Sequence, residues 1–434
     1  MRDIFSIRQG NRPKLCVGLA SPVQQLFRIQ RRPLDFPFHV WGARITPELE
    51  TRMPEAADRL VASGISENDQ LAETAAYGEA IERYAFSLAE SHVSSIPVTP
   101  AGAPFSERLI FDLPFLLPRS LARREWAHLA RHSPCRIMPC RRLDGEGKST
   151  NAVLPVELLP PQGRFTIFQT TNGMATGFSL NDAIDRGIRE VIERDALMLM
   201  WLFQVRGLSV SPASVLPQPY CEMIHRMAGL GVRVLIQDIS TEFGYFVFLV
   251  SIEGDRDGEA YRLSFGAGAA RQPCQAASHA FREASLSWKG AFWRDIEERS
   301  SSRGVVTAPR SFAEHGNWYL GNQFRKHLRF ILQPRRSTSA LKRRSISTCS
   351  SSYLSRPCTP MAPKGKDAYV IDLSTSDIRA CGAFVVKVVV PGLVPLYFSD
   401  LVADELAHAR LPIKLGERTI NRSDSINMEP HPWP

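Results

Sequence analysis

Glu190-Val-Ile-Glu-Arg-Asp195 and Glu79-Ala-Ile-Glu-Arg-Tyr84 repeat one phrase, Glu-x-x-Glu-Arg, in two distant parts of the chain. Residues three and four apart share one face of an α-helix, so each phrase would present two carboxylates and a guanidinium together. Apolar residues at helical spacing surround both phrases, and a third stretch shows the same spacing. We therefore predict helices over residues 68–89, 180–203 and 273–293.

Short runs of β-branched residues lie between and after these helices. They predict strands at residues 232–239, 245–252, 369–373 and 384–390. Gly266-Ala-Gly268 lacks the third glycine of a phosphate-binding loop, so we interpret it as a turn. Residues 197–203 continue the apolar face of the second helix and are predicted to be core. Together these elements indicate an α+β fold with mixed β-sheets and helices.

The chain of 434 residues is long enough for two lobes, since single cores rarely grow beyond about 250–300 residues. Residues 1–55 are rich in Arg and Pro and predict an irregular lead-in with a short strand or two. Residues 56–434 then form the main domain, interrupted by a tract at 333–363 that lacks apolar periodicity. The tract predicts a disordered loop; a divergent insertion and a local reading-frame error are the alternatives.

The net charge of +9 does not indicate a nucleic-acid-binding surface. Residues 325–366 hold eleven Lys and Arg and no acid, so the basic balance belongs to this one tract. Aromatic residues do not alternate with its cations, as they do in a single-strand binding groove. We therefore expect no nucleic-acid partner.

The chain begins without the apolar segment of a secretory signal, and its longest apolar run is about half a membrane span. We expect a cytoplasmic protein with no membrane partner. The eight cysteines form no CxxC pair and no disulfide framework, so most are interpreted as reduced thiols.

The paired glutamates suggest metal chemistry. Neighbouring carboxylates repel each other unless a cation lies between them, and Mg²⁺ takes oxygen ligands together with nucleotide phosphates. Two acidic helix faces turned toward each other would hold two such ions. The alternative is that each phrase is a solvated helix face with an internal Glu–Arg pair. Recurrence of the phrase favours the binding role.

At these positions the sequence resembles the YcaO family. The motifs that carry the resemblance are Gly78-Glu-Ala-Ile-Glu-Arg-Tyr84, Thr171-Asn-Gly-Met-Ala-Thr-Gly177, Glu190-Val-Ile-Glu-Arg-Asp195, Gly266-Ala-Gly268 with Glu283, Val388-Val-Val-Pro-Gly-Leu393 and Pro430-His-Pro-Trp-Pro434. The match covers roughly residues 55–330 and 367–434, and the chain has no Walker lysine loop that would indicate a different ATP site.

The resemblance implies a YcaO-like fold whose nucleotide site is lined by acidic helices and binds ATP and Mg²⁺. The implied metal ligands are Glu79, Glu82, Asp182, Glu190, Glu193 and Glu283. The same glutamates, with Arg83, Arg194 and His279, would bind the nucleotide. The terminal prolines Pro430, Pro432 and Pro434 resemble the tail that reaches the active site in azoline-forming members, so they are the implied catalytic-site residues.

The implied activity is that of an ATP-dependent cyclodehydratase of thiazole/oxazole-modified peptide (bacteriocin) biosynthesis. A Cys, Ser or Thr of a ribosomal precursor peptide attacks the preceding carbonyl, and ATP phosphorylates the amide oxygen so that it leaves as phosphate. The implied partners are that peptide and a separate leader-binding protein, E1-like or containing an RRE domain. A homodimer is also compatible with these residues.

Four positions depart from the family pattern: Ala75, Phe178, His279 and Leu286 stand where serine, asparagine, arginine and glutamine are usual. Each change removes a donor or a ligand near the implied nucleotide site. The cyclodehydratase would then have reduced ATP turnover, and two alternatives to it stay open. They are a degenerate scaffold that binds peptide or partner without hydrolysing ATP, and a relative that forms thioamides.

Overall fold

The computed structural model describes residues 15–18, 21–31, 35–46, 61–92, 96–98, 135–155, 171–256, 259–300, 326–335, 359–396, 411–415, 418–421 and 424–433. The chain divides into two compact units, as its length predicts. Unit 1 comprises Met1–Gln30, His39–Val191 and Leu354–Tyr397, and unit 2 comprises Arg31–Phe38, Ile192–Tyr353 and Phe398–Pro434. Most of the predicted tract at 333–363 lies outside the described residues.

Unit 1 contains two antiparallel sheets with a helix between them. The first sheet has the order β1-β2-β3, formed by β1 (Val23–Ile29), β2 (His39–Ile45) and β3 (Val61–Ser66). The second has the path β4-β5-β12-β13-β7, with β6 paired to β5. Its strands are β4 (Ile96–Val98), β5 (Cys135–Leu143), β6 (Ser149–Pro155), β7 (Met174–Gly177), β12 (Ala368–Asp372) and β13 (Phe384–Val389). The short helix α11 (Ser376–Ala380) connects β12 to β13.

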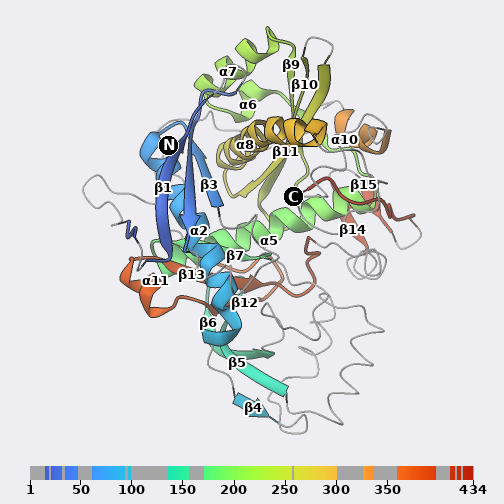
Figure 1. Cartoon of the computed structure of the whole chain (residues 1–434). Coiled ribbons are helices and arrows are strands. Elements are labelled where there is room, and N and C mark those ends of the chain that lie inside the picture. The colour runs from blue at the N-terminus through green and yellow to red at the C-terminus, as the bar shows by residue number, and fades with distance from the viewer. Residues whose placement is uncertain are drawn as a thin grey trace. The chain divides into compact units, whose positions relative to one another are not determined.

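Helix α2 (Asp69–His92) joins the two sheets into one core. Its buried residues share a cluster with Ala43 and Ala62 of the first sheet and with Ile371 and Val385 of the second. Figure 1 shows α2 beside the blue strands β1 to β3. Strands β1 and β2 belong to the predicted lead-in, and their pairing with β3 makes them part of this sheet.

Unit 2 is built on an antiparallel sheet of order β11-β10-β9-β8. The strands are β8 (Leu208–Val210), β9 (Val232–Asp238), β10 (Phe246–Arg256) and β11 (Glu259–Ala270). Helix α8 (Pro273–Ser300) packs along β11 and β10 (Figure 1). The remaining described elements are α6 (Pro212–Val215), α7 (Gln218–Ala228), α10 (Arg329–Leu332), β14 (Ile413–Leu415) and β15 (Arg418–Ile420).

The three predicted helices are confirmed as α2, α5 (Leu180–Leu202) and α8. The four predicted strands are confirmed as β9, β10, β12 and β13. The α+β fold of sheets and helices is likewise confirmed. The described strand pairs are all antiparallel, and parallel pairing occurs in two isolated bridges, Val17 with Val23 and Leu208 with Arg335. Residues 197–203 are buried, as predicted.

The turn predicted at Gly266-Ala-Gly268 is wrong, because these residues lie inside strand β11. Their glycines serve close packing. A Cβ on Gly266 would lie 2.1 Å from the backbone nitrogen of Ala284, and one on Gly268 would lie 2.3 Å from the carbonyl oxygen of Ala276. Both contacts are with α8, so the missing side chains let this helix approach the sheet.

Among the described residues, no helix is long and apolar enough to cross a membrane. Of the described cysteines, Cys16, Cys140, Cys221 and Cys381 are free thiols, whereas Cys274 is disulfide-bonded.

Candidate nucleotide and metal site

Helix α2 positions the first glutamate pair. Asn68 caps the helix, because its side-chain Oδ1 accepts hydrogen bonds from the backbone nitrogens of Gln70 and Leu71 at 3.0 and 3.1 Å. The helix can lie close to β3 because Gly64 has no side chain; a Cβ there would lie 2.2 Å from the nitrogen of Ala76. Three residues after Ala76 comes Glu79, so this contact fixes the start of the acidic face.

Helix α5 is positioned by the same kind of contact. Ser179 caps it by accepting a hydrogen bond from the backbone nitrogen of Asp182 at 3.1 Å. A Cβ on Gly187 would lie 2.6 Å from the Val388 side chain and 2.9 Å from the carbonyl oxygen of Gly173. Glu190 follows Gly187 by three residues, so the contact of Gly187 with Val388 holds this turn of α5 close to β13.

Glu82 of α2 and Glu190 of α5 act on each other in unit 1. Burial, followed by the charges of Glu79 and Glu190, raises the pKa of Glu82 well above its ordinary value of 4.5. Arg83 and a backbone hydrogen bond with Thr176 oppose this rise. Two helices distant in sequence therefore bring their carboxylates together, and the resulting repulsion favours a cation at this place.

Several arginines brace acidic residues along the two helices. Arg83 forms an ion pair with Glu79 at 3.1 Å and also donates a hydrogen bond to the carbonyl oxygen of Val61 at 2.9 Å. On α5, Arg186 pairs with Asp182 at 3.1 Å. Arg83 thus forms an ion pair within its own Glu-x-x-Glu-Arg phrase. The roles of Arg83 in nucleotide binding and of Asp182 as a metal ligand stay predictions.

Lys387, which was not predicted from the sequence, interacts electrostatically with Glu82 and Glu190. Lys387 of β13 is buried, and its Nζ donates a hydrogen bond to the carbonyl oxygen of Asn172 at 3.1 Å. Burial lowers the pKa of Lys387 from 10.5 to about 8, and the charges of Glu190 and Glu82 oppose the decrease. The sequence signal was the interruption of the valine run Val385-Val-Lys-Val-Val389 by a cation.

The other predicted site residues lie in unit 2. Glu193 and Arg194 are half-buried residues further along α5. His279 and Glu283 are half-buried on α8, which the glycines of β11 hold close to the sheet. Their meeting with the glutamates of α2 stays a prediction.

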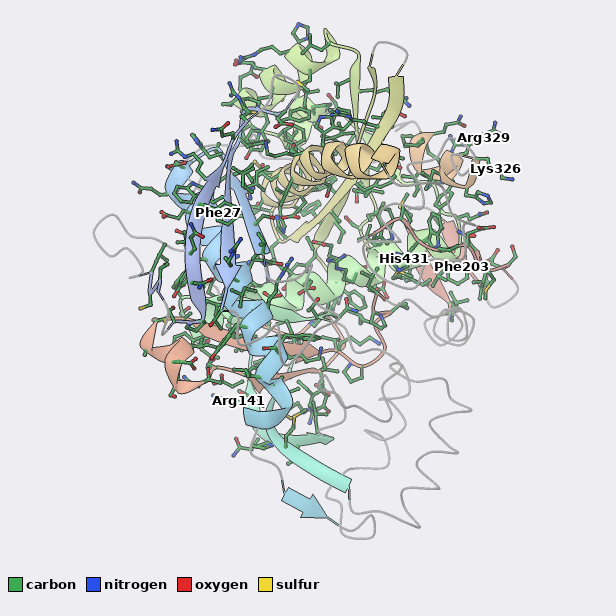
Figure 2. All side chains as sticks on the ribbon, in the orientation of Figure 1. Phe27, Arg141, Phe203, Lys326, Arg329 and His431 are labelled. Carbon is green, nitrogen blue, oxygen red and sulfur yellow. The ribbon has the colours of Figure 1, made fainter. Side chains whose placement is uncertain are left out.

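The C-terminal tail is anchored to the end of α5. Trp201 Nε1 donates to the carbonyl oxygen of Glu429 at 2.9 Å, and the backbone nitrogen of Asn427 donates to the carbonyl oxygen of Leu202 at 2.7 Å. Trp433 packs edge-on against Phe265, with ring centroids 5.2 Å apart. Figure 2 labels Phe203 at the end of α5 and His431 in the tail. Pro430 is half-buried, Pro432 is buried, and Pro434 lies outside the described residues.

The donor set fits Mg²⁺ held jointly with a nucleotide. Within the described ranges, no group of three or more His, Cys, Asp or Glu side chains could hold a metal ion by itself. Mg²⁺ usually binds through one or two carboxylates and completes its octahedron with water and phosphate oxygens. Glu82 with Glu190 supplies two carboxylates that repel each other, which is the arrangement that such an ion would relieve.

Comparison with known proteins identifies the family and its cofactors. A family model described as "YcaO cyclodehydratase, ATP-ad Mg2+-binding" matches residues 63–394. ATP and Mg²⁺ are the cofactors that the sequence resemblance implies.

Two solved structures share the fold. A structure described as "Heterocyclase in complex with substrate and Cofactor" is 19% identical, has a TM-score of 0.67, and aligns with 95% of this chain and 55% of its own. The E. coli microcin synthetase McbBCD complex with bound pro-MccB17 is 16% identical, with a TM-score of 0.57 and coverage of 85% and 87%. At these identities the likeness shows the fold alone.

One curated relative is an uncharacterised protein of Methanothermobacter thermautotrophicus, 24% identical over 237 residues. The match covers 54% of this chain and 58% of the relative. The chain thus spans little more than half the length of this relative and of the heterocyclase.

Proposed function

The chain belongs to the YcaO family, and from this premise we propose that it is the ATP-dependent cyclodehydratase component of a peptide-modifying system in the cytoplasm. Its substrate would be a ribosomal precursor peptide whose Cys, Ser or Thr residues are closed onto the preceding amides as azolines. A separate leader-binding protein would present the peptide. The observation that carries the proposal is the approach of Glu82 on α2 to Glu190 on α5, inside the region that the family model matches.

The residues of the chain would work by positioning and charge neutralisation. Glu82 and Glu190 would hold Mg²⁺, joined by Glu79, Asp182, Glu193 and Glu283 as the further predicted ligands. Arg83 keeps Glu79 in place through its ion pair, while Arg194 and His279 would contact phosphates. When bound, Mg²⁺-ATP supplies the phosphoryl group that converts the amide oxygen into a good leaving group. The nucleophile belongs to the peptide, so the chain needs no catalytic Ser or Cys.

The C-terminal prolines are the further residues proposed for the site. The hydrogen bonds of Asn427 and Glu429 to the end of α5 fix where the proline segment leaves the core. Pro430, Pro432 and Pro434 would then line the place where the peptide amide reacts. Proline has no backbone N–H donor and its φ angle is fixed, so such a segment would present a conformationally restricted surface to the substrate.

The test is product analysis with purified chain, precursor peptide, leader-binding partner and Mg²⁺-ATP. Azoline formation removes one water per ring, and phosphate release should accompany it in the wild type but fall to background in Glu193→Ala. A peptide in which oxygen is replaced by sulfur would identify a thioamide-forming enzyme instead. Equal background phosphate release from both proteins, with an unchanged peptide, would identify a scaffold.

A further inference from the structure

Lys387 is a buried cation in an apolar strand. The side chains around it on β13, Val385 to Val389, are all buried valines, and Lys387 itself is 6% exposed. Lysine is among the residues least often buried without a partner, because removing an ammonium from water costs several kcal/mol. The structure therefore has to supply negative charge near this position.

The hydrogen bond of Lys387 fixes its position but does not neutralise it. Its Nζ donates to the backbone carbonyl oxygen of Asn172 at 3.1 Å, which is an uncharged acceptor. The turn that contains this carbonyl is itself held to β13, because the nitrogen of Val388 donates to the carbonyl oxygen of Gly173 at 2.7 Å. Asn172 Nδ2 also donates to Leu396 at 2.8 Å. The ammonium thus stays in one place on a rigid support.

Both helices of the candidate site pack against the strands beside Lys387: a Cβ on Gly187, three residues before Glu190 in α5, would lie 2.6 Å from the Val388 side chain, and α2 contacts β7 and β13. Glu190 of α5 and Glu82 of α2 are the carboxylates whose charges act on Lys387. They are also the two that act on each other. The charge of one buried cation therefore acts on both members of a pair of carboxylates that would otherwise repel each other.

We propose that Lys387 is a positioning residue whose ammonium serves as a built-in counter-ion, holding Glu82 and Glu190 together before metal and nucleotide bind. Naming Mg²⁺ and ATP as the later occupants rests on the proposed function. The lysine would also set the order of binding. A divalent ion alone is repelled by the ammonium, whereas an ion arriving with phosphate brings negative charge that the ammonium attracts.

The test compares thermal unfolding midpoints in EDTA and in millimolar Mg²⁺, without ATP or peptide. Wild type should show little response to Mg²⁺ alone. Lys387→Met should unfold at a lower temperature in EDTA, and Mg²⁺ should raise its midpoint by about 2–4 °C or more by replacing the missing cation. Lys387→Arg should keep the wild-type response. Lys148→Met, at an exposed position of the same unit, is the matched control and should change neither midpoint.

A purely structural lysine would give a different pattern. Lys387→Met would then lower the unfolding midpoint equally in EDTA and in Mg²⁺, and that result would overturn the proposal. A rise of the Lys387→Arg midpoint in Mg²⁺ as large as that of Lys387→Met would overturn it too. If Lys387→Met does not fold, the double variant Lys387→Met with Glu190→Gln tests the counter-ion role in its place. Because it removes one charge of each sign, it should fold with a midpoint near that of wild type in EDTA. A double variant that also fails to fold would overturn the proposal as well.

These readouts are independent of catalysis. If the chain forms no azoline but shows the predicted pattern of unfolding midpoints, the proposed function is refuted and the counter-ion role of Lys387 is supported. If the chain forms azolines but lacks the pattern, the counter-ion role is refuted and the proposed function is supported.

Discussion

Gly64 of β3 lies directly against the backbone of Ala76 in α2, where a Cβ would come within 2.2 Å of the alanine nitrogen. The same relationship joins Gly266 of β11 to Ala284 of α8 at 2.1 Å, and Gly177 of β7 to Ala183 of α5 at 2.4 Å. Each of the three long helices that carry the predicted site residues thus packs on a strand through a glycine. The position of the acidic residues depends on these contacts.

Replacing Gly64 by alanine should therefore destabilise the protein. The new methyl group would meet backbone atoms of Ala72 and Ala76, which cannot move aside as a flexible side chain can. We expect a loss of about 1–3 kcal/mol in the free energy of unfolding, measured by urea denaturation. Gly145→Ala is the control, since nothing lies within 4 Å of a Cβ at that position. Equal stability of the two variants would show that α2 can shift away from β3.

Breaking the buried ion pair of unit 2 should have a larger effect. Lys289 Nζ contacts Asp35 Oδ2 at 2.5 Å, and both side chains are almost fully buried. Lys289→Met leaves a carboxylate in the core without its cation, which typically costs about 3–5 kcal/mol. Arg226→Met, which breaks the exposed pair with Glu222, should change stability by less than about 1 kcal/mol. Similar losses in both variants would contradict this account.

The tail anchor gives a third prediction. Asn427 is buried, and its Nδ2 donates to the carbonyl oxygen of Trp201 at 3.3 Å. Asn427→Ala should destabilise the protein by about 1–3 kcal/mol, because it leaves that acceptor without this donor. Limited proteolysis followed by mass analysis should release the C-terminal residues faster than in wild type. Asn421→Ala, at an exposed position, should be cleaved at the wild-type rate.

A fourth prediction concerns acid stability at the start of α2. Asp69 accepts a hydrogen bond from Trp41 Nε1 at 3.0 Å and pairs with Arg28 at 2.5 Å; the Trp41 bond and then Arg28 lower its pKa below 3.8. A lowered folded-state pKa contributes stability that is present above 3.8 and is lost as the pH falls through the folded value. The free energy of unfolding of wild type, measured by urea denaturation, should exceed that of Asp69→Asn at pH 7. The difference in this free energy, at most about 1 kcal/mol because the site is partly exposed, should vanish in strong acid. A difference that persists there would refute the assignment.

The helices could be predicted because their period is local. Apolar spacing predicted the starts of α2, α5 and α8 to within one residue, although α8 continues seven residues beyond its predicted end, and β-branched runs predicted β9, β10, β12 and β13. The error at Gly266-Ala-Gly268 has a physical cause. Glycine in a sequence suggests a turn, but here its missing side chain makes room for α8, and that contact involves residues that the local pattern does not reveal.

The site was predictable only in part for a similar reason. The Glu-x-x-Glu-Arg phrase predicts carboxylates sharing a helix face, and the structure brings Glu82 close enough to Glu190 to raise its pKa. Nothing in the phrase indicates which strand lies beneath the helices. Lys387 was therefore missed, because a lysine within a valine run gains a role only when β13 and the two helices are in place.

The central claim, that Glu82 and Glu190 hold Mg²⁺ and nucleotide together, can be tested without peptide or partner. Calorimetry would measure the binding of a non-hydrolysable ATP analogue, with and without Mg²⁺, to wild type, Glu190→Gln and the exposed control Glu146→Gln. We predict Mg²⁺-dependent binding to wild type and the control, and affinity for Glu190→Gln at least about tenfold weaker. Equal affinity of wild type and Glu190→Gln in Mg²⁺ would contradict the account.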